Sequence, residues 1–368
     1  MASYPTKLAE AFASRALEIY YQTAVAEAIT NQDYEGEIRD KSSILNILTF
    51  SKILSKTYSG ANLTADDLTE SSGQLITSQA KAFYFRVKSY DKFRSYIKNP
   101  EGTILDQTGK ELKKVVDQYV LGFYTEALGS NRVGTDYTTG TVAVDASGNV
   151  TGSSTVFTSA MVGRGFLAAG MTSAAKIATY SGATAITIVD DLDDSGAGVY
   201  TGGVIGGGAT YAVIAASAVQ ATKSTIYDQI NSLGVLLDKN EIPEDNRWIV
   251  LPPELVKLVR EAPEFIPSGV PSSYDKLVLD GRFINARIGG TMAGFEVFKS
   301  ARVPGDSVNG WHIMAGHKSA ITFAMGFVET GMEDLIGNFG KAYKSLNVYG
   351  AKVVDERKKA LTELFAKL

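Results

Sequence analysis

The stretch Lys239–Ala262, KNEIPEDNRWIVLPPELVKLVREA, contains the end of one helix, a proline turn, a buried strand and the start of a second helix. Asn240 and Pro243 are residue types that end helices. The continuous apolar run within Arg247–Leu251 is typical of a short strand covered on both faces. The proline pair Pro252–Pro253 suits the first turn of the next helix, because an amide there has no intrahelical partner.

Apolar residues upstream of this stretch recur at helical spacing, which predicts a helix with one buried face. These residues are Val219, Ile226, Ile230, Leu233 and Leu237. The sequence therefore predicts a helix, a proline turn, a buried strand and a second helix in that order.

This order of elements resembles the axial domain of tailed-bacteriophage major capsid proteins, in which a helix leads to a proline-flanked strand and then to another helix. Gly289–Ser300, reading GGTMAGFEVFKS, resembles that family's hairpin, and Val303 and Pro304 follow it as Val-Pro does there. Val348–Val354, reading VYGAKVV, resembles the family's last long strand. The resemblance rests on the order of these pieces along the C-terminal part of the chain.

The resemblance implies an α+β protein with the Hong Kong-type capsid fold. At 368 residues the chain exceeds what one compact core usually holds, so several lobes are expected. The expected parts are an N-terminal arm at 1–35, an extended loop and peripheral-domain strands at 36–91, the peripheral domain with its spine helix at 92–128, an inserted β-rich domain at 129–216, the axial domain at 217–340, and a peripheral-domain strand with the C-terminus at 341–368.

Composition sets limits that agree with this interpretation. Hydrophobic residues make up 45% of the chain and charged residues 21%, enough to bury a core. The chain has no cysteine, so disulfides and thiolate metal sites are excluded. A net charge of −4 argues against a dedicated nucleic-acid binder. No apolar run is long enough to predict a membrane span, and no signal peptide is visible.

The N-terminal half predicts elongated elements. Phe12 to Ala26 has the spacing of an amphipathic helix. The sequence favours equally a helix that packs on its own subunit and one that reaches a neighbour. Ile38–Tyr58 and Leu75–Val87 predict an extended hairpin around the polar tip Ala61–Gly73. A lone hairpin is marginal in water. The residues by themselves favour a mobile surface hairpin, whereas the resemblance implies that it lies on another subunit.

Charged residues of this region are the candidate inter-subunit contacts: Lys52, Lys56, Asp66, Asp67, Glu70, Arg86 and Lys88. Some members of the family that the chain resembles join subunits by an isopeptide bond between a loop lysine and an asparagine, with a glutamate accepting the proton. Lys52 or Lys56 and Asn338 or Asn347 are the residues available here. The catalytic environment has no residue-by-residue match, so we expect no crosslink.

A helix is predicted from Asp106 to Leu128, and it resembles the spine helix of the family. The glycine-rich segment that follows, with few charges, predicts an inserted β module built as a small barrel or sandwich. Its predicted strands are Thr141–Val144, Thr155–Phe157, Lys176–Tyr180 and Ala185–Val189. Val150–Gly163 is similar to a β module of several phage structural proteins.

No catalytic, cofactor or metal site is predicted. His312 and His317 flank an apolar run and are interpreted as strand and turn residues, since no nucleophile elbow accompanies them. The glycine clusters lack a phosphate-loop or dinucleotide pattern. Four acids, Asp190, Asp191, Asp193 and Asp194, could hold a hard cation, but their spacing favours a solvated turn.

The resemblance implies a non-enzymatic major capsid protein that assembles as hexamers and pentamers around double-stranded DNA, without sequence-specific binding. It implies a scaffolding protein, a portal and a possible cement protein as partners, no membrane, and a location in the virion capsid after assembly in the host cytoplasm. Two other hypotheses stay open. One is an encapsulin-like compartment, and the other is a phage adhesin or tail component whose β module binds glycan.

Overall fold

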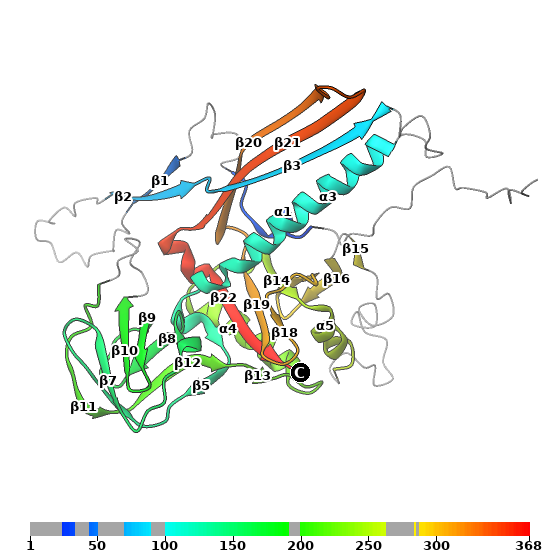
Figure 1. Ribbon diagram of the computed structural model, residues 1–368. Helices are drawn as coiled ribbons and strands as arrows, with labels where there is room; N and C mark the ends of the chain where they lie inside the picture. Colours follow the sequence, from blue (N-terminus) through cyan, green and yellow to red (C-terminus); the bar gives the residue numbers. More distant parts are fainter. Residues whose placement is uncertain are drawn as a thin grey trace, which may run out of the picture.

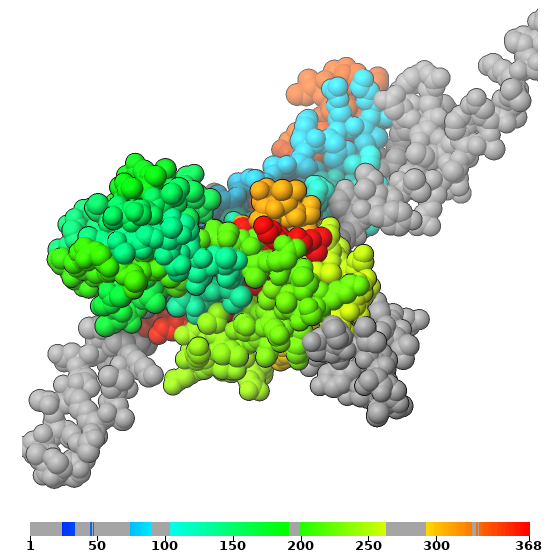
Figure 2. Space-filling model, turned by 90° about the horizontal axis from the view of Figure 1, so that it is seen from below, coloured from blue at the N-terminus to red at the C-terminus, as the bar shows by residue number. Residues whose placement is uncertain are grey.

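A computed structural model describes residues 24–33, 44–50, 70–89, 100–190, 199–262, 283–284 and 287–368. Figure 1 shows a central sheet with helices α4 and α5, an eight-stranded lobe beside it, and a long three-stranded sheet that projects with helix α3 along it. Seen from below in Figure 2, the eight-stranded lobe stands beside the main body as a bulge of its own. The mixed α+β class predicted from the sequence is confirmed.

The central sheet has nine strands. Its main order is β13 (Val219–Gln220), β22 (Leu361–Lys367), β19 (Gly310–His317), β14 (Arg247–Leu251), β17 (Phe295–Lys299), β16 (Arg287–Met292) and β15 (Phe283–Ile284). Two short strands lie off this path: β18 (Gly305–Asp306) pairs with β19, and β4 (Arg132–Val133) pairs with β22.

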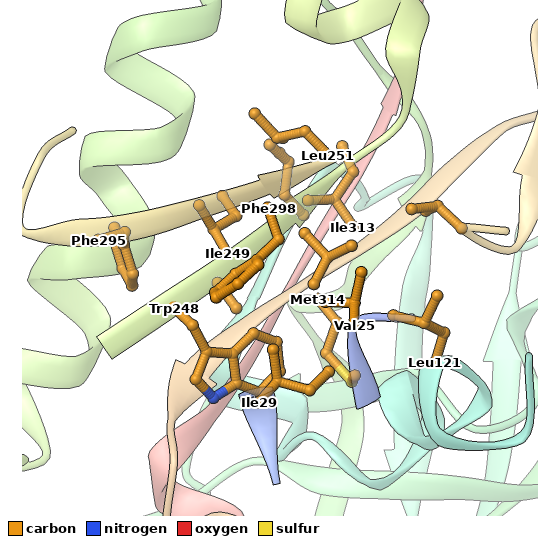
Figure 3. Close-up of a cluster of buried hydrophobic side chains, with 14 of the residues drawn as sticks. Val25, Ile29, Leu121, Trp248, Ile249, Leu251, Phe295, Phe298, Ile313 and Met314 are labelled. Atoms are coloured by element: carbon orange, nitrogen blue, oxygen red, sulfur yellow. The ribbon is translucent and has the colours of Figure 1, made fainter. Parts of the chain in front are cut away.

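The stretch that predicted the fold has the predicted structure. Every residue of β14 is buried, and the strand runs between β17 and β19. Helix α4 (Ile226–Lys239) precedes it and α5 (Pro253–Arg260) follows, with Pro252 at its N-cap. Figure 3 shows Trp248 and Ile249 of β14 in the main core, among side chains of neighbouring strands and helices.

One detail differs from the predicted helix, and another agrees with the predicted hairpin. Val219 lies in β13, paired with β22, because the helix begins only at Ile226, after a Thr222–Thr225 hydrogen-bonded turn. The predicted hairpin is β16–β17, and its turn residues Ala293 and Gly294 have φ of 49° and 80°. Left-handed backbone at both central residues is what a two-residue hairpin turn requires.

The projecting sheet has the order β20 (Ile321–Asp334), β21 (Gly340–Val353) and β3 (Gln79–Lys88). Strand β21 extends the predicted strand Val348–Val354 towards the N-terminus. Helix α3 (Pro100–Leu121) packs on one face, where the rings of Tyr119 and Tyr349 lie 5.6 Å apart. The helix begins before the predicted Asp106. It ends before Leu128 because the chain continues from Gly122 as a 3₁₀ helix, η1 (Gly122–Glu126).

The predicted extended hairpin is only partly described. Strands β1 (Ile44–Phe50) and β2 (Glu70–Ile76) pair antiparallel, and the residues between them lie outside the described part of the chain. The single predicted strand Leu75–Val87 is wrong. β2 ends at Ile76, and β3 begins at Gln79 and pairs with β21, which offers it a partner along its whole length. Of the predicted N-terminal helix, the structure describes α1 (Ala26–Ile29).

The segment predicted to be an insertion, called the inserted domain below, forms one eight-stranded sheet around its own core of buried side chains. Its order is β11 (Ile205–Ala209), β6 (Thr141–Val144), β7 (Asn149–Ser153), β10 (Ala185–Asp190), β9 (Ala175–Gly182), β8 (Gly165–Ala168), β12 (Tyr211–Ser217) and β5 (Thr135–Tyr137). Three of the four predicted strands correspond to β6, β9 and β10. The predicted strand Thr155–Phe157 is wrong, although Phe157 is buried and its amide donates to the Ala183 carbonyl.

The end of the chain differs from the division made on sequence. β21 belongs to the projecting sheet, as expected for residues 341–368, but β22 returns to the central sheet between β13 and β19. Leu361 and Leu364 of β22 are completely buried there. The last strand therefore stabilises the domain predicted as axial, because its apolar side chains complete that core.

Candidate functional site

The predicted inter-subunit residues do not form one group. Lys52, Lys56, Asp66 and Asp67 lie outside the described residues, and Glu70 is the first residue of β2. Arg86 and Lys88, in contrast, lie on β3 and are exposed to solvent. These two belong to the projecting sheet and not to the hairpin β1–β2, because β3 pairs with β21.

The two faces of β3 differ as the sequence alternation predicts. Phe83, Phe85 and Val87 are half-buried, and the ring of Phe85 stacks on Tyr343 of β21 at 5.2 Å. Tyr84 points to the other face and is 64% exposed. The apolar side chains therefore share a face with Tyr343, and the polar ones face solvent.

An ion pair lies on the solvent face of the projecting sheet. Lys344 of β21 donates to Glu333 of β20, and this hydrogen bond raises the pKa of Lys344. At the end of the same hairpin, Ile336 and Phe339 are 101% and 90% exposed. Both apolar side chains of this projecting turn therefore stand in solvent in the single subunit.

A second constellation is buried where the inserted domain meets the central sheet. Both carboxylate oxygens of Glu363, on β22, are occupied by cations. Arg164 Nη1 donates to Oε1 at 2.8 Å, and Arg132 Nη1 donates to Oε2. His312 Nδ1 lies 2.6 Å from Oε1. Arg164 comes from the inserted domain, so this junction cluster ties that domain to the strand that ends the chain.

Aromatic rings enclose the junction cluster. The imidazole of His312 lies between the rings of Tyr124 and Phe365, at centroid distances of 4.2 Å and 4.3 Å and nearly parallel to both. The Arg164 guanidinium lies 4.7 Å from the Phe365 centroid, a cation–π distance. The stack excludes water on both sides of the imidazole, so the polar contacts inside it form in a low-dielectric environment.

Local backbone geometry brings Arg164 to this place. Gly165, the next residue, approaches Gly129 so closely that an added Cβ would lie 2.6 Å from its Cα. On the other side of the carboxylate, Arg132 Nη2 donates to the carbonyls of Thr125 and Ala127 at 2.9 Å and 2.8 Å. The two arginines therefore reach Glu363 from the start and from the interior of the inserted sequence.

The electrostatics of the junction cluster suit a structural role. Burial by itself would raise the pKa of Glu363, but the charges of Arg132 and Arg164 and the contact with His312 lower it to about 2. A carboxylate this acidic is a poor proton acceptor. His312 is a strand residue, as predicted, but its ionic partners were not. His317 accepts from the Ser319 amide in a turn, and burial lowers its pKa.

Asp117 is the other buried acid with ion-pair and backbone partners. It lies on α3 and accepts hydrogen bonds from the amides of Val25 and Ala26 at 2.9–3.1 Å, and Arg302 donates to it. Burial, the largest influence, raises the pKa of Asp117 despite these partners. Asp117 thereby ties the start of α1 and the loop after β17 to α3.

A cavity of about 480 Å³ lies next to Asp117, between α1, α3 and strands β20 and β21. Its walls include Leu112, Val116 and Phe323, with Asp117 and Glu27 as its acids. Its lining contains no histidine, and Glu27 pairs with Lys113 of the same wall at 2.9 Å. The cavity wall offers no catalytic constellation.

The described residues contain neither a cluster of metal-binding side chains nor a membrane-spanning helix. Within them, no three histidine, aspartate or glutamate side chains converge on a metal position. Asp190 of the predicted acidic loop accepts from the amide and hydroxyl of Thr201, while Asp191, Asp193 and Asp194 lie outside the described part. Over the same ranges, no helix combines the length and apolar character needed to cross a membrane.

Comparison with known proteins relates the whole chain to phage structures. No protein-family model and no curated protein matches the sequence. A solved structure from Mycobacterium phage Che8 aligns with 98% of this chain and 98% of its own, at 17% identity and a TM-score of 0.61. The capsid structure of cyanophage P-SCSP1u aligns with 98% and 93% of the two chains, at 11% identity and a TM-score of 0.58.

The capsid of Ralstonia phage GP4 aligns with 100% of this chain and 98% of its own, at 12% identity and a TM-score of 0.57. Identities this low establish similarity of fold. The chain therefore has the fold of these phage capsid chains over its full length, and the resemblance seen in the sequence is confirmed at the level of fold.

Proposed function

We propose that this chain is the major capsid protein of a tailed double-stranded DNA bacteriophage, which assembles as hexamers and pentamers into an icosahedral shell. The observation that carries the proposal is the end-to-end structural match, which covers 98% of this chain and 98% of the Che8 chain. A match of this extent includes the projecting sheet, the central sheet and the inserted domain together. A shared module in an otherwise different protein would align over one part only.

Features of the surface support an assembling subunit. The projecting sheet is long and thin, and its tip leaves Ile336 and Phe339 in water. Shells distribute many modest contacts over elongated subunits, so apolar side chains that are open in one subunit become covered in the assembly. The net charge of −4 suits a wall that encloses DNA without sequence-specific binding.

The remaining parts of the proposal follow from the capsid role. The chain acts structurally and not as an enzyme. It occupies the virion after assembly in the host cytoplasm, with a scaffolding protein, a portal and a possible cement protein as partners. We retain the proposed arm, extended loop, peripheral, inserted and axial parts, with β22 assigned to the axial sheet on its pairing with β19.

Electron microscopy of the full chain, expressed with its neighbouring genes, tests this proposal. We expect closed particles of uniform diameter, or tubes and sheets of the same subunit. A stable monomer under these conditions would contradict it. Particles that contain a cargo enzyme and no DNA in an infected host would favour the encapsulin-like compartment. Glycan binding by a protein that does not assemble would favour the adhesin.

The same particles test for covalent joining of subunits. We propose that none occurs. Asn347 is half-buried against the cavity beside α3, whereas Asn338 is exposed in the turn of the β20–β21 hairpin. Mass spectrometry of denatured particles is expected to show the monomer mass alone. A dimer or longer series, each lighter by one ammonia per bond, would show isopeptide crosslinks.

A further inference from the structure

The two outer strands of the projecting sheet carry opposite charge. β20 contains three acids and no base, and β3 contains three bases and no acid. We define the acidic edge as Glu329, Glu333 and Asp334, and the basic edge as Lys81, Arg86 and Lys88. In the described part of the chain, β21 lies between these two strands and pairs with both.

Within one subunit the two edges do not neutralise each other. Two strand spacings, about 10 Å, separate them. The acidic edge instead reaches the middle strand, where Glu333 binds Lys344. No ion pair joins β20 to β3 among the described residues. Each sheet therefore presents one negative and one positive edge.

Strand register places much of this charge on the face that points away from α3. Ala342 is paired with both Glu333 and Arg86, so these side chains share its face. Tyr343, the next residue, stacks with Phe85 on the opposite, apolar face. Register places Glu329 and Lys88 on the face of Glu333 and Arg86, where all four are exposed. Asp334 and Lys81, also exposed, lie on the face of Tyr343.

The tip of the same hairpin lies beside both edges. Leu335 donates its amide to the Gly340 carbonyl at 3.1 Å, which closes the turn and presents Ile336 and Phe339 outward. Gly340 is paired with Lys88 of the basic edge. An apolar tip flanked by charge has the composition of a contact surface with a dry centre and a polar rim.

We propose that the acidic edge of one subunit binds the basic edge of a second copy of this chain, and that the same contact covers the tip formed by Ile336 and Phe339. This inference rests on the proposed function and specifies a surface for it. Because each edge repels its own kind, the contact joins two different surfaces. Repetition of such a head-to-tail contact forms a ring when the rotation between neighbours closes, and an open filament when it does not.

The second copy is the partner that the charges favour. Three acids on one strand match three bases on the other, and both strands belong to every subunit. Charge complementarity directs partner choice and suppresses like-charge docking. A different protein would need to complement only one of the two edges.

Charge reversal of the full-length protein tests the proposal. One variant carries Glu329→Lys and Asp334→Lys, a second carries Arg86→Glu and Lys88→Glu, and a third carries all four changes. Each double variant is expected to raise the protein concentration needed for assembly by about tenfold or more, because like charges then face each other. The variant with four changes keeps the original net charge of −4 and is expected to assemble near the original concentration.

The salt dependence of assembly provides a second test, because its sign should differ between the original protein and the double variants. Added salt is expected to weaken assembly of the original protein and to strengthen it for each double variant, since screening removes attraction in one and repulsion in the other. Replacement of Ile336 and Phe339 by serine is expected to raise the assembly concentration without changing its salt dependence. Circular dichroism and thermal melting confirm that every variant is folded.

The outcomes separate this inference from the proposed function. If the original protein forms particles and folded double variants assemble equally well, the inference is overturned and the capsid proposal stands. The same holds if the double variants assemble but lose binding of another virion protein. If the original protein forms no particles, a mixture of the two double variants decides. The variant with Glu329→Lys and Asp334→Lys has two positive edges, and the variant with Arg86→Glu and Lys88→Glu has two negative edges. If sedimentation shows that the two variants do not associate, the inference is overturned.

Discussion

The junction cluster and the projecting sheet use charge in opposite ways. At the junction, Glu363 is completely buried, and Arg132, Arg164 and His312 occupy its oxygens. On the projecting sheet, acids and bases are exposed and segregated to different strands. The comparison teaches that the chain pairs its buried charges internally, where they fix one domain to another, and leaves most charges of the two outer strands in solvent.

The physical reason is the cost of burying an ion. A carboxylate removed from water is tolerated only when hydrogen-bonded cations replace its hydration. Each contact at the junction therefore restricts where the inserted domain can sit. Exposed ions keep their hydration, so the sheet edges cost little before assembly and can steer a neighbour into place.

Glu363→Gln should produce the largest effect on stability. It leaves Arg132 and Arg164 buried without a counter-charge, which is expected to lower the free energy of unfolding by about 3–5 kcal/mol. Denaturant unfolding of the full chain measures this. Glu333→Gln, the same substitution on the exposed sheet, is the matched control. Equal effects at the two sites would break the comparison between buried and exposed charge.

The stability of the folded chain should depend on pH through the ionisation of Glu363 in the junction cluster. The pKa of Glu363 is about 2 in the folded chain, below its ordinary value of 4.5, so its stabilisation is complete above pH 4.5 and is lost as pH falls towards 2. The full shift corresponds to about 3 kcal/mol.

Glu363→Gln should remove this part of the pH dependence. Asp117 acts in the opposite direction, because its raised pKa favours the folded state as pH falls. Unfolding midpoints at several pH values, compared between the original and Glu363→Gln, provide the measurement. An unchanged slope between pH 4.5 and pH 2 in the variant would show that Glu363 is not the titrating group.

Asp117→Asn tests the second buried acid and is expected to have a smaller effect. Asparagine keeps an acceptor for one of the amides of Val25 and Ala26 but loses the charge that faces Arg302, at a cost of about 1–3 kcal/mol. Asp106→Asn, at an exposed position of the same helix, should be neutral. Hydrogen exchange at Val25 and Ala26 should accelerate only in Asp117→Asn. Unchanged exchange there would contradict the assigned role.

Glu333→Gln should have the smallest effect on the isolated subunit. The pair with Lys344 is about half exposed on both sides, where solvent screens the interaction and side-chain ordering offsets it. Thermal melting of the unassembled protein should not distinguish the variant from the original. A clear fall in melting temperature would show that charge on the sheet also holds the subunit together, and would weaken the contrast with the junction.

The sequence predicted the parts of the fold in which local pattern and burial agree. Strand β14 has an uninterrupted apolar run between a helix-ending segment and a proline pair, so one structure satisfies both local and tertiary preferences. The β16–β17 hairpin follows the same logic, because Gly294 supplies a left-handed turn position. The prediction of a single strand over Leu75–Val87 was wrong, because alternation indicates a strand but does not identify the strand with which it pairs.

The junction cluster was missed although two signals pointed to it. Glu363 is an acid in a mostly apolar strand, and Arg164 is one of three charged residues between positions 138 and 188. Each indicates a buried charge that needs a partner. Neither identifies the other, because they are far apart in the chain and meet only through the packing of Gly165 on Gly129. Arg86 and Lys88, predicted as inter-subunit contacts, lie on β3, which pairs with β21, and their role as contacts stays a prediction.

The sequence by itself determined the α+β class, the axial helix–strand–helix order, the β character of the inserted module and the alternation of β3, because each depends on neighbours along the chain. Only the tertiary structure decided that β3 pairs with β21, that β22 completes the central sheet, and that Glu363 pairs with Arg132 and Arg164. Those contacts join residues distant in sequence, and their free energy comes from burial and charge pairing that exist only after the chain has folded.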